Sequence, residues 1–303
     1  MSEPLPVAAG IVSFHPDAEL LLDLVAVLSR DVDRVYLFNN ASLDPALEMV
    51  LADYPKLVAI EAGTNLGVGV GLNVIALAAS RDGYERLALF DQDSRPWPGM
   101  LPLLGAAFDR LEASRRAPAA VAPRLVAPRG RVAEASKPPR YRARRGAAPE
   151  GDLVPVDFLP TSGTLFNLVT LRETGLFRAD FFIDAIDTEW CFRAWARGRS
   201  CWLAPDVPME HTVGTGTIPL GFGLSMPNQR PFRMGTYLRN NLYALRLRHV
   251  PLGWKLKQIA YLPLQGFGFA RHHGFRAEAV RPMLRGLADG LRGRLGVPPG
   301  LDP

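Results

Sequence analysis

The sequence predicts an α/β fold with a mainly parallel sheet flanked by helices, extended at its C-terminal end by a basic helical region. Three observations support this prediction. Strand-like and helix-like segments alternate over the first third of the chain, and a polar residue follows each strand-like segment. From Arg230 onward the chain holds 13 Lys and Arg residues against three acidic ones.

The strand-like and helix-like segments follow one another in regular order. Runs typical of buried strands are found at Val7–Phe14, Arg34–Phe38, Leu57–Ile60 and Arg86–Phe90. Helical patterns lie between them at Asp17–Ser29, Asp44–Asp53 and Val68–Ser80. Because parallel strands need a crossover between them, this alternation is typical of βαβ units.

Polar side chains gather where these strands end. Ligands of parallel sheets bind at the carboxyl ends of the strands. The residues at these ends are Ser13, Asn39, Asn40, Asn65, Gly67, Asp91 and Asp93. We therefore expect one polar crevice along this edge of the sheet.

Asp91 and Asp93 alternate along an extended segment, so both carboxylates face the same side. Mg²⁺ and Mn²⁺ prefer oxygen ligands and commonly take one or two carboxylates together with phosphate oxygens. The pair is therefore a candidate metal–diphosphate site. A capping or turn role before the Pro-rich bend that follows is the alternative.

A second acidic cluster contains Asp184, Asp187 and Glu189 among aromatic residues, next to a helix expected from about Asp187 to Arg197. Carboxylates in apolar surroundings have raised pKa values and suit proton transfer. Arg193 follows Glu189 by four residues, so an ion pair is expected there and Asp187 is the better base. A capping role for these acids is the alternative.

Two further segments leave alternatives open. His211 follows a strand-like segment and precedes a Gly-rich loop, so it either completes a metal shell or has a structural role. Residues 115–151 are rich in Arg, Ala and Pro and predict a long loop with at most a short hairpin. That loop is either a solvated insertion or a clamp for an anionic ligand.

Residues 235–295 predict two or three basic amphipathic helices. Aromatic and cationic residues alternate there, namely Tyr237, Arg239, Tyr243, Trp254, Lys255, Lys257, Tyr261 and Arg271. Such helices lie on anionic membranes, whereas packing on the body or forming a homo-oligomer is the alternative. We expect one domain over residues 1–228 and this helical region over residues 229–303.

Composition excludes several classes of protein. The whole chain has a net charge of +5, so the residues before Arg230 are net acidic, which does not favour a nucleic-acid module. No stretch offers the ~20 uncharged apolar residues of a membrane span, and we expect no signal peptide. The two cysteines, Cys191 and Cys201, form no CxxC motif, which predicts neither a zinc site nor a disulfide and fits a reducing compartment.

Six segments in order resemble the family-2 glycosyltransferases with a GT-A fold, and in particular their bacterial rhamnosyltransferase branch. They are "IVSFHP", "LFNNAS", "TNLGVGVGLN", "LFDQDSRP", "FFIDAIDTEWCFRA" and "HTVG", within residues 7–216. The resemblance implies an inverting, metal-dependent transfer from a nucleotide-sugar, with dTDP-rhamnose the favoured donor. It also implies a lipid-linked or saccharide acceptor in cell-surface polysaccharide (O-antigen or exopolysaccharide) synthesis, at the cytoplasmic face of the plasma membrane.

The same resemblance implies roles for individual residues. Asp91 and Asp93 match the DxD element that holds Mg²⁺ or Mn²⁺, with Asp93 the direct ligand, and His211 matches a metal-side histidine. Asp187 matches the catalytic base, with Glu189 as the second candidate. The nucleotide-side positions are Ser13, Asn40, Asn65 and Gly67, together with Asp91 and, on the helix that follows, Asn73.

Three departures from the family pattern affect specificity. Asn39 stands where many relatives have an Asp that contacts the base or ribose, so the nucleotide preference is open. The Asp187-Thr188-Glu189 order replaces a commoner Glu-Asp pair. The Gln-x-x-Arg-Trp element of processive synthases is absent, so we expect the addition of one sugar or a few. Other donors (galactofuranosyl, glucosyl), a nucleotidyltransferase and a non-catalytic sugar-nucleotide binder are the alternatives.

Overall fold

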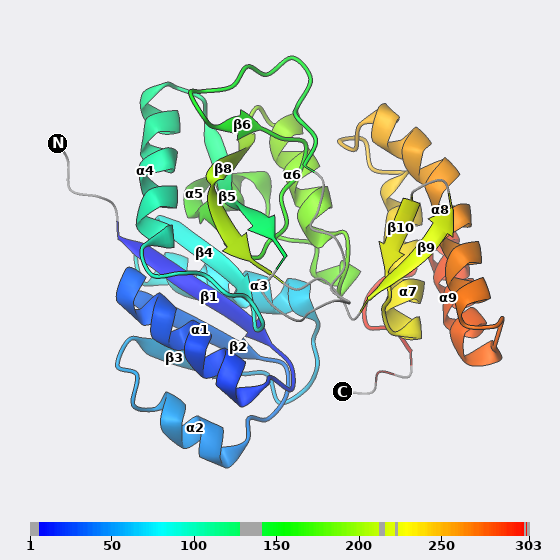
Figure 1. The fold of residues 1–303 in the computed structure, drawn as a ribbon, viewed down its shortest axis with the longest axis horizontal. Helices are drawn as coiled ribbons and strands as arrows, with labels where there is room; N and C mark the ends of the chain where they lie inside the picture. Colours follow the sequence, from blue (N-terminus) through cyan, green and yellow to red (C-terminus); the bar gives the residue numbers. More distant parts are fainter. Residues whose placement is uncertain (1–5, 128–140, 212–215, 222–223, 300, 302–303) are drawn as a thin grey trace.

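The computed structural model describes residues 6–127, 141–211, 216–221, 224–299 and 301. A larger α/β body holds the main sheet, and the C-terminal helices with a small hairpin form a second lobe beside it (Figure 1). The loop after His211 and the middle of the 115–151 segment lie partly outside the described residues, so the clamp role proposed for that segment stays a prediction.

The main sheet has eight strands in the described part of the chain, in the order β3-β2-β1-β4-β7-β5-β8-β6. Its strands are β1 (Val7–Ser13), β2 (Arg34–Asn39), β3 (Leu57–Glu61), β4 (Arg86–Asp91), β5 (Pro118–Val126), β6 (Val154–Pro155), β7 (Thr164–Asn167) and β8 (Ser200–Glu210). Strands β1 to β4 pair in parallel, as do β5 and β8, whereas β7 and β6 run antiparallel to their neighbours. The expected mainly parallel sheet is thereby confirmed.

Helices cover both faces of this sheet. They are α1 (Ala18–Asp31), α2 (Pro45–Leu51), α3 (Val68–Arg81), α4 (Met100–Ala113), α5 (Leu168–Thr174) and α6 (Ile186–Ala196). One hydrophobic cluster joins α1, α2 and α4 to one face, and a second joins α3, α5 and α6 to the other. Asp17 and Asp44 accept backbone hydrogen bonds at the starts of α1 and α2, which explains where these helices begin.

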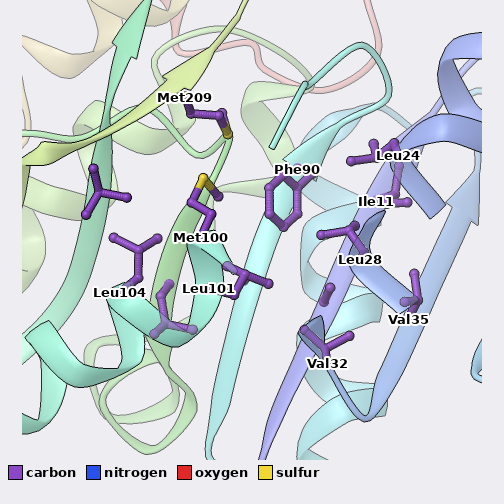
Figure 2. Close-up of a cluster of buried hydrophobic side chains, with 14 of the residues drawn as sticks. Ile11, Leu24, Leu28, Val32, Val35, Phe90, Met100, Leu101, Leu104 and Met209 are labelled. Atoms are coloured by element: carbon purple, nitrogen blue, oxygen red, sulfur yellow. The ribbon is translucent and has the colours of Figure 1, made fainter. Parts of the chain in front are cut away.

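The first cluster holds the strands whose ends carry the polar residues. Figure 2 shows Phe90 of β4 between Leu24 and Ile11 on one side and Met100 and Leu101 of α4 on the other. All five side chains are at most 2% exposed. Because buried side chains pack on both sides of Phe90, they fix the end of β4, where Asp91 lies.

The prediction of a loop from residue 115 onward is wrong at its start. Pro118–Val126 forms β5, a strand inside the sheet that is buried along most of its length. Its pairing with β8 shifts register next to Pro118 and between Pro123 and Arg124. Proline cannot donate a backbone hydrogen bond, and such irregularities are where strands tolerate it.

The second lobe contains β9 (Thr217–Gly221), β10 (Leu224–Pro227) and three basic helices. These helices are α7 (Pro231–Ala244), α8 (Leu252–His272) and α9 (Ala277–Arg292), as the sequence predicts. Helices α7 and α9 pack closely, and the carbonyl group of Gly235 occupies the space that a side chain at Gly286 would need. Among the described helices, none has the length and apolar character needed to cross a bilayer.

Candidate active site

The carboxyl ends of three strands meet at one edge of the sheet. In the strand register, Ser13 of β1 pairs with Asn39 of β2, and Val12 of β1 pairs with Asp91 of β4. The buried Ser13 hydroxyl donates a hydrogen bond of 2.9 Å to Asn39 Oδ1. The predicted polar edge is therefore present, and a hydrogen bond connects two of its residues, Ser13 and Asn39.

The predicted nucleotide-side residues shape the neighbouring loops. Asn40 Oδ1 accepts a hydrogen bond from Leu66 N at 3.0 Å, and Asn65 Oδ1 accepts one from Gly67 N at 3.0 Å. Asn73 exchanges two hydrogen bonds of 2.9 Å with the backbone of Phe177. The amide groups of these asparagines therefore order the backbone of the loops near this edge of the sheet.

Asp91, Asp93 and His211 form a cluster in which the ligand atoms lie within 4.8 Å of one another. His211 comes from the end of β8 and places Nε2 3.7 Å from Asp91 Oδ2. Two contacts bring these distant segments together: Arg95 N donates to Glu210 O at 3.3 Å, and Trp97 Nε1 donates to Pro208 O at 2.7 Å. The turn after β4 is thus fastened to the end of β8.

The donor set of this cluster fits a divalent cation. Burial raises the pKa of Asp93, and the neighbouring Asp91 carboxylate raises it further. His211 Nδ1 is buried and has no hydrogen-bond partner among the residues that the structure describes. Two carboxylates and an imidazole with a free nitrogen are ligands that a divalent metal takes, and its charge would offset the repulsion between the two acids.

Asp187 lies in the first turn of α6, close enough for the charges of Asp91 and Asp184 to influence it. Burial raises its pKa to about 6, even though the Thr188 backbone and hydroxyl donate to its Oδ1. A carboxyl group with that pKa is well matched to accept a proton near neutral pH.

The loop before Asp187 has a strained backbone. Phe182, Asp184 and Ala185 have φ values of 64°, 67° and 62°, a region that residues with a side chain rarely occupy. Val68 N at the start of α3 donates to Phe182 O at 2.7 Å. Gly67 leaves the space for this contact, because a Cβ there would lie 2.7 Å from Phe182 O. Such strain persists only where the surroundings impose it, and it is frequent at functional sites.

Helix α7 holds the other side of this loop. Asn240 Nδ2 lies 2.9, 2.7 and 3.0 Å from the carbonyl oxygens of Phe181, Ile183 and Asp184. Arg239 Nη2 donates to Phe181 O at 3.0 Å. The expectation of an exposed basic and aromatic face is therefore wrong for three residues of this helix. Arg239 is 4% exposed, and Tyr237 and Tyr243 lie partly buried against the hydrophobic clusters.

Arg233, which the sequence analysis does not identify, also comes from α7. Its Nε donates to Asp184 Oδ1 at 3.0 Å, and its charge reaches Asp91 and Asp187. Asp184 Oδ2 is buried without a partner in the described structure, and burial raises the pKa of this carboxyl. No local signal reveals the contact, because 49 residues separate its two members.

Glu189 points into a different environment from Asp187. It is 2% exposed and forms two hydrogen bonds with Arg193, of 3.1 and 2.9 Å, as the spacing predicts. His249 Nε2 lies 2.7 Å from Glu189 Oε1. Burial raises the pKa of Glu189, but the His249 and Arg193 contacts outweigh it and hold the pKa below its ordinary value. Both carboxylate oxygens are therefore engaged in a buried ionic network.

Cys191 and Cys201 are both buried and free. Burial raises the pKa of the Cys191 thiol well above its ordinary value. A thiol in that state is a poor nucleophile.

Comparison with known proteins identifies a relative of this chain. The chain is 25% identical over 290 residues to "dTDP-rhamnosyl transferase RfbF" of Shigella flexneri, an alignment that covers 95% of this chain and 96% of that protein. No family model matches the chain.

Solved structures share the fold at low identity. S. aureus TarS matches with a TM-score of 0.57 at 14% identity, over 98% of this chain and 50% of that chain. A shorter form, TarS 1–349 in complex with UDP-GlcNAc, gives 0.57 at 15% identity over 95% and 81% of the two chains. GalNAc-T7 with UDP, GalNAc and Mn²⁺ gives 0.55 at 12% identity over 97% and 58%. The chain thus spans half of full TarS and little more than half of GalNAc-T7.

The resemblance to family-2 glycosyltransferases of the rhamnosyltransferase-like branch is confirmed by this relative, and the solved structures confirm the GT-A fold alone.

Proposed function

We propose that this chain is an inverting, metal-dependent glycosyltransferase that moves one sugar, in first place L-rhamnose from dTDP-rhamnose, to an acceptor hydroxyl. One observation carries the proposal. The cluster of Asp91, Asp93 and His211 lies at the carboxyl edge of the sheet, within electrostatic reach of a partly buried carboxyl, Asp187, whose pKa burial raises to about 6. The similarity to a dTDP-rhamnosyl transferase along nearly the whole chain supports the choice of donor.

Each group has a defined task in this proposal. Asp91, Asp93 and His211 would hold Mg²⁺ or Mn²⁺, which supplies positive charge opposite the leaving diphosphate. Asp187 accepts the proton of the acceptor hydroxyl while that oxygen attacks the anomeric carbon. The bond from the sugar to the diphosphate breaks in the same step, so the anomeric configuration inverts. Ser13, Asn40, Asn65, Gly67 and Asn73 shape the nucleotide side of the crevice.

Glu189 has a supporting task in this proposal. Its contact with His249 fastens α6 to the segment between α7 and α8, and its ion pair with Arg193 lies within α6. The contact with His249 orients the helix that carries Asp187. A lipid-linked or saccharide acceptor in surface polysaccharide synthesis, and work at the inner face of the plasma membrane, complete the proposal.

Isothermal calorimetry tests the donor site. Binding of dTDP-rhamnose is measured with Mg²⁺, with Mn²⁺ and with EDTA, beside UDP-glucose, UDP-galactofuranose and GDP-mannose. We expect metal-dependent binding of dTDP-rhamnose that Asp93→Ala weakens by about tenfold or more. Asp53→Ala, which removes an exposed acid after α2, is the control and should bind as the wild type does.

The other results have defined meanings. If the protein prefers another sugar nucleotide, the assignment of dTDP-rhamnose as the donor is wrong, but the assignment as a glycosyltransferase stands. Absence of binding to all four, in a protein that melts cooperatively, contradicts the proposal and favours a nucleotidyltransferase.

A further inference from the structure

Helix α8 carries a continuous apolar face that no described residue covers. Leu252, Leu256, Ile259 and Phe267 are exposed at 70, 59, 57 and 60%, and Pro263 between them is exposed as well. At 3.6 residues per turn, these five positions fall within an arc of about 80° and extend over about 22 Å of helix. We call these five residues the α8 stripe.

The opposite side of α8 is packed, which fixes the outward direction of the stripe. Leu262 and Phe269 are buried in the cluster that joins α8 to α7 and α9. A side chain at Gly268 would collide with Leu220 of β9. The Trp254 ring lies 5.6 Å from the Phe192 ring of α6, centroid to centroid, and holds the first turn against the body.

An aromatic contact prolongs the stripe beyond the end of the helix. Phe275 is 56% exposed, and its ring centroid lies 5.9 Å from that of Phe267. Solvent-exposed aliphatic and aromatic side chains therefore continue from the first turn of α8 to the start of α9.

The charges around the stripe indicate what covers it. Helix α8 has no acidic residue. By the same helical geometry, the half-buried Lys255 and the exposed Arg271 lie next to the two edges of the apolar arc. From Arg246 to Arg294 the chain holds ten Lys and Arg residues against two acidic ones. A second copy of the chain packed on the stripe would bring like charges together, which costs free energy. An anionic surface with an apolar interior satisfies both features.

We propose that the α8 stripe docks on a bilayer that contains anionic phospholipid. Leu252, Leu256, Ile259 and Phe267 enter the boundary between headgroups and acyl chains, and the flanking cations contact lipid phosphates. Helix α8 lies in the plane of the surface. The proposal does not depend on the identity of the donor sugar. It assigns the contact to aliphatic side chains of α8 instead of Arg239 and Tyr237, which point inward.

Vesicle co-sedimentation of the full chain tests this docking. The vesicles contain about 30% phosphatidylglycerol in phosphatidylcholine, or phosphatidylcholine alone. The variant Leu256→Glu/Ile259→Glu places two carboxylates in the stripe. The matched control, Leu77→Glu/Leu103→Glu, makes the same change at half-exposed leucines of α3 and α4 on the body.

We expect the wild type and the control to bind the anionic vesicles, and the wild type to bind phosphatidylcholine vesicles more weakly. The stripe variant should bind anionic vesicles at least about tenfold more weakly than the control. Circular dichroism melts that coincide for the two variants ensure that both are folded.

Three results overturn the proposal. The first is binding of the stripe variant that equals binding of the control, and the second is no binding of the wild type to anionic vesicles. The third is a wild-type dimer in sedimentation equilibrium without lipid that the stripe variant splits, which assigns the stripe to self-association.

Discussion

Arg233 Nε lies 3.0 Å from Asp184 Oδ1, and this contact ties the first turn of α7 to the loop that precedes Asp187. The Asp184 side chain is only 10% exposed, and its second carboxylate oxygen is buried without a partner in the described structure. Arg233 is 45% exposed, so its guanidinium reaches from solvent to a buried carboxylate.

Removal of the Arg233 side chain should destabilise the protein. Arg233→Ala leaves the Asp184 carboxylate buried without its hydrogen-bond donor, at an expected cost of about 1–3 kcal/mol in the free energy of unfolding. Adding Asp184→Asn should recover part of this loss, because a neutral amide is cheaper to bury than a carboxylate. Urea unfolding measures the free energy of unfolding of both variants. The control is Arg230→Ala, which removes one cation from an exposed position. Equal stability of Arg233→Ala and Arg230→Ala would contradict this role.

Asp187 should set the acidic limb of the pH profile. Since burial raises its pKa to about 6, kcat/KM of the free enzyme should fall about tenfold per pH unit below that value. Asp187→Asn should lower kcat by about 10²–10⁴ and abolish this limb. Steady-state rates between pH 5 and 8 measure both effects, and a variant that keeps the wild-type kcat rules Asp187 out as the base.

The same pKa predicts a gain in stability. A carboxyl whose pKa is higher in the folded than in the unfolded state destabilises the protein as pH rises through these two values. Asp187→Asn should therefore raise Tm at pH 8 and leave it nearly unchanged at pH 4. Melting curves followed by circular dichroism at the two pH values measure the difference. If Asp187→Asn were less stable than the wild type at pH 8, the folded protein would favour the ionised Asp187 carboxylate, which contradicts the raised pKa.

Glu189 should matter for stability more than for the chemical step. Glu189→Gln leaves Arg193 and His249 without their carboxylate, and we expect a loss of about 3–5 kcal/mol at neutral pH. Because the pKa of Glu189 is lowered in the folded state, its contribution is present above the ordinary carboxyl pKa and is lost as pH falls through the lowered one. The difference from wild type should therefore shrink in acid. Urea unfolding at pH 7 and in acid tests this.

Activity separates the two acids. The folded fraction of Glu189→Gln should retain kcat within about threefold of wild type, far from the loss expected of a missing base. A loss as large as that of Asp187→Asn, in folded protein, would make Glu189 the base instead.

Gly67 is a position where a methyl group should be costly. Gly67→Ala places a Cβ 2.5 Å from the Phe182 ring at a φ of 87°, whereas Gly83→Ala, at a φ of 89°, meets no atom within 4 Å. The Gly83 variant should lose about 1–2 kcal/mol from the backbone alone, and the Gly67 variant about 2–4 kcal/mol. Only Gly67→Ala should also weaken donor binding, since it displaces the loop at Phe182. Unfolding curves measure the stability of both variants, and calorimetry measures their donor binding. Equal losses of stability in the two variants would contradict the predicted clash between the new methyl group and Phe182.

The sequence predicts the half of the site that lies on regular elements. Asp91 is the last residue of β4 and Asp187 lies in the first turn of α6, so periodicity is enough to place them. Strand β5 is missed because Pro118 and Pro123 are typical of loops, and only its neighbours in the sheet, β7 and β8, offer places that tolerate them.

Contacts between distant segments could not be predicted in this way. Arg233 meets Asp184 across 49 residues, and His211 reaches Asp91 because the turn after β4 pairs with the end of β8. Periodicity predicts that α8 is amphipathic, but it does not say which face the hairpin β9–β10 covers. Tertiary packing decides that, and it turns Arg239 inward and Leu256 outward.

The Asn240 amide donates to a loop that lies 56 to 59 residues earlier in the chain, so α7 helps to hold the loop before Asp187 in its conformation. Chimaeras that exchange residues 1–228 between this chain and a relative would combine the strained loop of one protein with the supporting helix of the other. We expect such hybrids to lose activity even when the donor crevice is transferred intact. A cut after Ala244 keeps the loop and its support together, and is the better junction for transplanting specificity.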